Sequence, residues 1–193
     1  MKHAIMTAVM ALTAMAAPGS NPENTVTVCL DGHPGFILTA ASAIASTMFA
    51  AIDVNVVWRR VLTGCPADAI LVSFKDQTPT EFLPGALAYA LPYEGTHICL
   101  LYDRVVQARE TRQAANIMAH VLVHEITHIL QGVCHHSASG IMKARWDGAD
   151  FSQMAWEPLK FTAQDIQMIR QGLEARHNRF LLAAQIPPDV AAR

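Results

Sequence analysis

Two histidines and a glutamate stand at a spacing that could bind a metal ion and activate water. The segment reads His124-Glu125-Ile126-Thr127-His128. On a helix of about 3.6 residues per turn, the two histidines share one face and lie about 6 Å apart along the axis. Their imidazoles could converge on one Zn²⁺ at about 2.0–2.1 Å from each nitrogen. The glutamate points elsewhere, so it suits a general base that takes a proton from zinc-bound water and passes it to a leaving amine.

The residues around this motif indicate an apolar helix. Apolar positions recur at helical spacing from Thr111 to Gln131, and Gly132 follows as a terminator. The rival interpretation is a surface helix that carries these polar residues by chance, but polar side chains among so many apolar ones need a partner. His120 extends the series, yet it lies about 12 Å along the axis from His128 and cannot share its ion. We therefore expect His120 to be a hydrogen-bonded core residue.

A catalytic zinc site normally has three protein ligands and one open position, so a further ligand is needed. Cys134, His135 and His136 stand together just after the helix, and Glu157 follows later in the chain. A thiolate ligand competes poorly with disulfide formation in an oxidising compartment. The neighbours of Glu157 do not place it on a clear helical face. The residue types alone leave these candidates open, with a histidine favoured.

The segment HEITHILQGVCHHSASGIM, residues 124–142, resembles the metzincin clan of zinc peptidases. The clan's motif is HExxHxxGxxH, followed by a turn that contains a methionine. Here an extra residue precedes Gly132, so strict spacing would reach Cys134. The segment is more similar to short secreted bacterial metalloprotease-like proteins that read HExxHxxxGxxxHS. That resemblance implies that His136 is the third ligand and that Met142 is the turn methionine, packed beneath the metal.

The remaining elements must position this helix. The alternation and apolar periodicity predict strands over 25–30, 54–58, 69–74, 86–91 and 97–102, and helices over 36–52, 111–131 and 162–173. A strand–helix–strand opening implies a crossover between parallel strands, and Pro92 suits the border of an edge strand. We therefore predict an α+β fold, which the resemblance makes zincin/metzincin-like. A twisted mixed sheet of about five strands with an antiparallel edge strand is backed by an early helix and the HExxH helix, and a C-terminal helix follows.

The amino-terminal segment is typical of an export signal. Lys2 precedes an uncharged run from Ala4 to Ala17, with small residues at Ala14 and Ala16. That run is shorter than the roughly 20 apolar residues that span a bilayer. We therefore predict a signal peptide over residues 1–16 and a single metallopeptidase-like catalytic domain over 17–193. The uncharged stretch 36–52 has a polar stripe, which favours a helix packed on a sheet over a membrane span.

The charge and cysteine content of the chain indicate which partners and which cellular compartment to expect. The net charge is −2 and the basic residues are scattered, which argues against binding to nucleic acid or to an anionic membrane. An even number of cysteines in an exported chain favours two disulfides, with three possible connectivities. The four cysteines are Cys29, Cys65, Cys99 and Cys134.

These observations predict a secreted zinc metalloendopeptidase with one catalytic Zn²⁺ held by His124, His128 and His136. Glu125 would be its general base, and its substrate would be a peptide or protein. We expect the enzyme to be a monomer, exported to the periplasm or outside the cell. The first alternative is a non-catalytic zinc-binding module on the same scaffold, in which a fourth ligand such as His135 or Cys134 closes the site. The second alternative is an exported protein that holds no metal.

Overall fold

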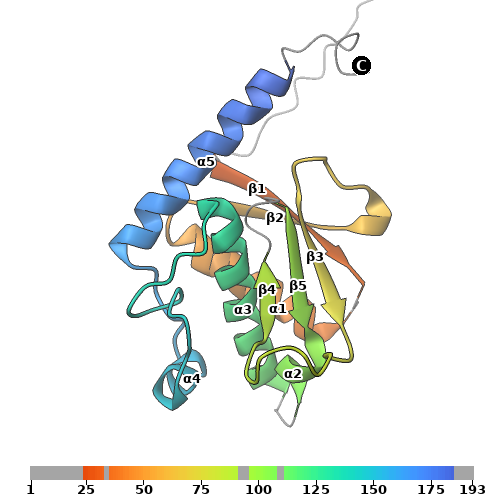
Figure 1. Cartoon of the computed structure of the whole chain (residues 1–193), viewed down its shortest axis with the longest axis vertical. Helices are drawn as coiled ribbons and strands as arrows, with labels where there is room; N and C mark the ends of the chain where they lie inside the picture. The colour runs from red at the N-terminus through yellow and green to blue at the C-terminus, as the bar shows by residue number, and fades with distance from the viewer. Residues whose placement is uncertain (1–23, 33–34, 91–95, 108–110, 185–193) are drawn as a thin grey trace, which may run out of the picture.

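The computed structural model describes residues 24–32, 35–90, 96–107 and 111–184 (Figure 1). The predicted signal peptide, residues 1–16, lies outside the described residues. Within the described ranges, no helix is both long enough and apolar enough to cross a membrane.

A five-stranded mixed sheet forms the base of the domain. Its strand order is β2-β1-β3-β5-β4. The strands are β1 (Thr25–Asp31), β2 (Asn55–Arg60), β3 (Ile70–Lys75), β4 (Ala88–Ala90) and β5 (His97–Leu101). All neighbours are parallel except β4, which pairs antiparallel with β5 at the edge. The structure therefore has the mixed sheet with an antiparallel edge strand that the sequence predicted.

Two long helices form the layer that carries the core. Helix α1 (Phe36–Ala50) supplies the crossover from β1 to β2, and α3 (Thr111–Gln131) packs against α1 and the sheet. The buried side chains of both helices and of the parallel strands form one apolar cluster. Fully buried members include Phe49, Ile70 and Leu122. Helix α5 (Ala163–Ala184) packs on α3 and then runs past the end of the sheet (Figure 1).

Several boundaries differ from the sequence prediction. The edge strand is short, three residues within the predicted range 86–91. Helix α5 continues to Ala184 rather than ending near residue 173. Two short helices, α2 (Tyr102–Val106) and α4 (Gly148–Met154), and a 3-10 turn at Val61–Thr63 were not predicted. Segments of five to seven residues show too little periodicity to be identified from the sequence.

The structure contains one disulfide among its described cysteines, so the expectation of two is wrong. Cys29 on β1 bonds to Cys65, whereas Cys99 and Cys134 are free. Cys99 is buried on β5, opposite Tyr89 in the ladder, and Cys134 is exposed in the loop after α3.

Helix α5 crosses α3 at a glycine. A Cβ atom on Gly172 would collide with the carbonyl oxygen of Leu130, near the end of α3. Because neither backbone can yield without displacing a helix, Gly172→Ala should lower the free energy of unfolding by about 1–3 kcal/mol. Chemical denaturation would measure this loss. Gly148→Ala, where nothing lies within 4 Å of the added atom, is the matched control and should be nearly neutral. Equal stability of the two variants would contradict the close crossing.

Candidate metal centre

The motif residues lie on the second half of α3, which covers residues 111–131 as predicted. The helix ends where Gly132 adopts a positive φ of 69° and its N–H bonds to the carbonyl of His128 at 2.9 Å. That left-handed conformation is easily accessible to glycine and turns the chain back over the helix face. The loop after the helix therefore returns toward the two motif histidines.

This return brings three histidines together. One nitrogen from each of His124, His128 and His136 lies within 4.8 Å of the other two. The ring centroids of His136 are 5.3 Å from those of His124 and 4.9 Å from those of His128. His128 is buried, His124 is half-buried and His136 is exposed. The predicted ligand set thus forms a cluster with one side open to solvent.

Backbone carbonyls orient two of these rings. The Nδ1 of His124 bonds to the carbonyl of Ile141 at 2.9 Å, and the Nδ1 of His128 contacts that of Val133 at 3.3 Å. A carbonyl can only accept, so each Nδ1 carries the proton. Burial lowers the pKa of both rings to about 4, which keeps them neutral. The Nε2 atoms are then two lone-pair acceptors.

Those two acceptors face each other at 3.0 Å with no hydrogen to share. Such an arrangement is unfavourable unless a cation lies between them. Two nitrogen ligands of a tetrahedral zinc, each about 2.0–2.1 Å from the ion, are about 3.3 Å apart. The donor set, its spacing and the carbonyls behind two of the rings therefore fit Zn²⁺.

The turn that follows His136 is closed by a backbone hydrogen bond and ends at a buried methionine. The N–H of Ser137 donates to the carbonyl of Met142 at 2.8 Å, closing a loop through Gly140. Gly140 has φ of 76°, and a Cβ atom there would collide with the carbonyl oxygen of Lys160. Met142 is fully buried in the core. It therefore occupies the turn that the resemblance implies, directly after the Ile141 carbonyl that holds His124.

Glu125 is separate from the histidine cluster. Its side chain is 8% exposed, and burial raises its pKa to about 7, while a hydrogen bond with the backbone of Ala90 acts in the opposite direction. Ala90 belongs to β4, the edge strand. The carboxyl group therefore lies between the motif helix and the edge strand. This position suits a proton acceptor and does not suit a ligand of the histidine cluster.

The other candidate ligands, Cys134, His135 and Glu157, do not belong to the three-histidine group. Cys134 is an exposed free thiol. His135 has a buried Nε2 atom with no hydrogen-bond partner among the described residues. Glu157 is exposed and pairs with Lys160 at 2.9 Å. Of the described residues, only the three named histidines form a group that could hold an ion.

His120 is the hydrogen-bonded core residue that the sequence predicted. Its Nδ1 lies 2.7 Å from the carbonyl of Asn116, and its Nε2 accepts the N–H of Leu159 at 3.0 Å. Both ring nitrogens are therefore occupied. The perpendicular indole of Trp146 packs beside it, with centroids 6.2 Å apart, and also beside His124 at 5.6 Å. Sequence reasoning missed Trp146, because an aromatic residue in a short loop carries no spacing signal.

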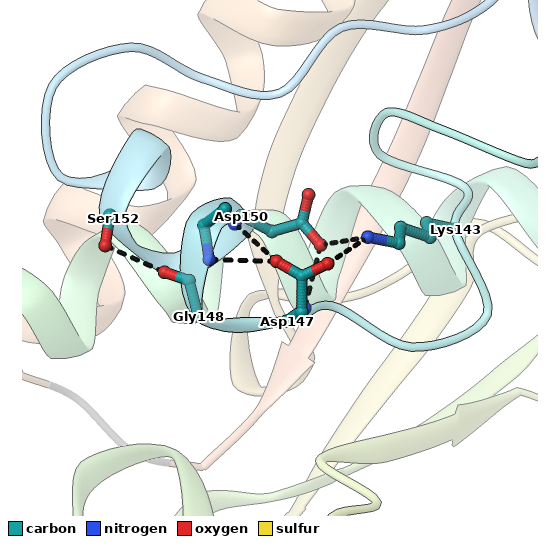
Figure 2. A network of polar contacts seen from close by, with 6 residues as sticks. Lys143, Asp147, Gly148, Asp150 and Ser152 are labelled. Carbon is teal, nitrogen blue, oxygen red and sulfur yellow. Dashed lines mark hydrogen bonds and ion pairs between the residues drawn. The ribbon is translucent and has the colours of Figure 1, made fainter.

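An ion-pair network joins Lys143 to two aspartates at the start of α4, Asp147 and Asp150 (Figure 2). The Lys143 ammonium lies 2.7 Å from a carboxylate oxygen of both Asp147 and Asp150. The two aspartates also form a capping box at the start of α4. The network therefore links the start of α4 to the preceding loop at residue 143. Its acidic residues are engaged with Lys143 and the helix start, so the network is structural.

Comparison with known proteins supports the fold. No protein-family model matches the chain, and no curated protein sequence matches it. Its structure is similar to that of archaemetzincin from Methanopyrus kandleri, with a TM-score of 0.55 and 12% sequence identity. The match covers 80% of this chain and 98% of that one. At this identity the likeness defines the fold, which is zincin-like, and the chemistry must be argued from the site.

Proposed function

We propose that this protein is a secreted zinc-dependent metallopeptidase that hydrolyses peptide bonds. The observation that carries the proposal is the set of three histidine nitrogens within 4.8 Å of one another, with a buried glutamate next to His124 in the sequence. The zincin-like fold of the archaemetzincin neighbour supports it. His124, His128 and His136 would hold one Zn²⁺. When bound, the ion would polarise a scissile carbonyl and lower the pKa of a water molecule.

The protein's own groups would handle the proton. The Glu125 carboxyl has a pKa near 7, raised by burial, so it can both accept and release a proton near neutral pH. It would take the proton from the attacking water and deliver it to the leaving amine. Its hydrogen bond to the β4 backbone holds the carboxyl beside the strand edge. The carbonyl contacts of His124 and His128 leave their Nε2 atoms free to bind the ion, which these two residues would hold.

The competing function is a non-catalytic zinc-binding module on the same scaffold. A closed structural site needs four protein ligands. Within the described residues the cluster contains three histidines, with His136 exposed and both His135 and Cys134 outside the group. A three-ligand cluster open to solvent favours the catalytic alternative.

The remaining features of the proposal concern where and on what the enzyme acts. We expect export to the periplasm or beyond through a signal peptide over residues 1–16. The Cys29–Cys65 disulfide is compatible with an oxidising compartment. The substrate would be a peptide or protein and the enzyme a monomer, without nucleic-acid partners or stable membrane insertion after signal cleavage.

Metal removal tests the proposed function directly. The purified mature chain should contain one zinc per molecule by elemental analysis and should cleave an unstructured protein such as casein. Dialysis against a chelator should abolish cleavage, and one equivalent of Zn²⁺ should restore it, since the ion polarises the carbonyl and activates the water. A chain that binds zinc stoichiometrically but cleaves no member of a broad peptide library would instead support the binding module.

A further inference from the structure

A buried carboxylate lies next to the histidine cluster and takes no part in the proposed proton transfer. Asp165, in the first turn of α5, has no solvent-exposed surface. Within the described part of the chain, no lysine or arginine forms an ion pair with it. A buried charge without a cationic partner is costly. Its presence therefore requires an explanation beyond packing.

The hydrogen bonds of Asp165 connect two parts of the structure. One carboxylate oxygen accepts the N–H of Thr162 at 2.8 Å and its hydroxyl at 2.7 Å, which caps α5. The other oxygen accepts the hydroxyl of Ser137 at 2.7 Å. Ser137 directly follows His136 and closes the turn to Met142. The carboxylate therefore holds the segment that carries His136 to the start of α5.

Helix capping alone does not account for this arrangement. Asp150 occupies the same position in the capping box of α4, where it bonds to the N–H of Asp147 at 2.8 Å and pairs with Lys143 (Figure 2). Asp165 makes the equivalent cap, but its second oxygen accepts the hydroxyl of Ser137, the residue after His136, and among the described residues no lysine or arginine pairs with it.

We propose that Asp165 is the positioning residue for His136 and supplies the negative charge that balances the metal ion. This inference rests on the proposed zinc site. Three neutral imidazoles would leave a bound Zn²⁺ with its full charge. The buried carboxylate of Asp165 would balance part of that charge, since it bonds to Ser137, the residue after the third ligand. The metal in turn is the missing cationic partner of Asp165.

Zinc affinity, measured by competition with a chromogenic chelator, tests this role. Asp165→Asn keeps the shape of the side chain and removes the charge, so zinc binding should weaken by about 10–100-fold. Asp150→Asn makes the same change in the other capping box and should leave zinc affinity unchanged. Ser137→Ala should weaken binding by removing the link to His136, and Ser137→Thr, which restores a hydroxyl, should recover it.

The outcomes separate this inference from the proposed function. Equal zinc affinity in the wild type and Asp165→Asn would overturn the positioning role while leaving the metallopeptidase proposal intact. Equal losses in Asp165→Asn and Asp150→Asn would also overturn it, because the effect would then be one of helix capping. If Asp165→Asn fails to fold, the Ser137 pair decides: a Ser137→Ala variant with wild-type affinity rejects the link. A wild-type chain without zinc affinity would overturn both proposals.

Discussion

Glu125→Gln should lower kcat/KM for peptide hydrolysis by about 10²–10⁴-fold, because an amide cannot accept the proton of the attacking water. Zinc content should stay at one ion per chain, since Glu125 is outside the histidine group. A fluorogenic peptide assay and elemental analysis on the same sample would measure both quantities. Glu157→Gln is the matched control, because that carboxylate is exposed and bonded to Lys160. Activity equal to that of the wild type in Glu125→Gln would remove this residue from the mechanism.

The stability of metal-free Glu125→Gln would show whether such a loss of activity reflects misfolding. Burial raises the pKa of Glu125 from 4.5 to about 7, so the folded state disfavours the ionised carboxyl. Since the folded pKa lies above the unfolded one, the destabilisation is complete above pH 7 and disappears below about 4.5. Metal-free Glu125→Gln should therefore be more stable than the wild type at pH 8, by on the order of 3 kcal/mol. The difference should shrink as the pH falls toward 4.5. Urea denaturation at the two pH values would measure it.

The sequence was most informative where chemistry and periodicity coincide. The spacing of His124 and His128 predicted both the helix over 111–131 and the shared face of the two rings, and the structure has both. His120 could be excluded as a ligand by helix geometry alone, and its two ring contacts agree. Local rules of this kind need no knowledge of the rest of the fold.

The sequence was least informative where distant segments meet. The pairing of Cys29 with Cys65 depends on where the end of β1 lies relative to the loop before β3, and no spacing rule specifies that. The carbonyls of Val133 and Ile141 that orient the histidines are backbone atoms, so residue types do not reveal them. The cap that Thr162 and Asp165 form at the start of α5 is a local arrangement, but the second bond of Asp165, to Ser137, joins segments far apart in the sequence. Tertiary contacts decide all three cases.

His136→Ala should weaken zinc binding by more than about 100-fold, because loss of a direct ligand should exceed the 10–100-fold effect of removing an outer partner. His135→Ala is the matched control one residue away. Its Nε2 makes no hydrogen bond within the described structure, and its ring is outside the cluster, so zinc affinity should not change. Chelator competition would give both affinities, and the spectrum of the cobalt-substituted protein would report the ligand set.

The variants His136→Ala, His135→Ala and Cys134→Ser together show which residue after the motif binds the metal, given the extra residue before Gly132. Strict metzincin spacing reaches Cys134, whereas the structure turns at Gly132 and brings His136 to the two helix histidines. The Ser137–Met142 hydrogen bond and the Ser137–Asp165 bond both lie directly after His136, so they support that register and no earlier one. Zinc loss in His135→Ala or Cys134→Ser, with retention in His136→Ala, would mean that the loop adopts a different register. The turn to Met142 and the link to Asp165 would then have to shift with it.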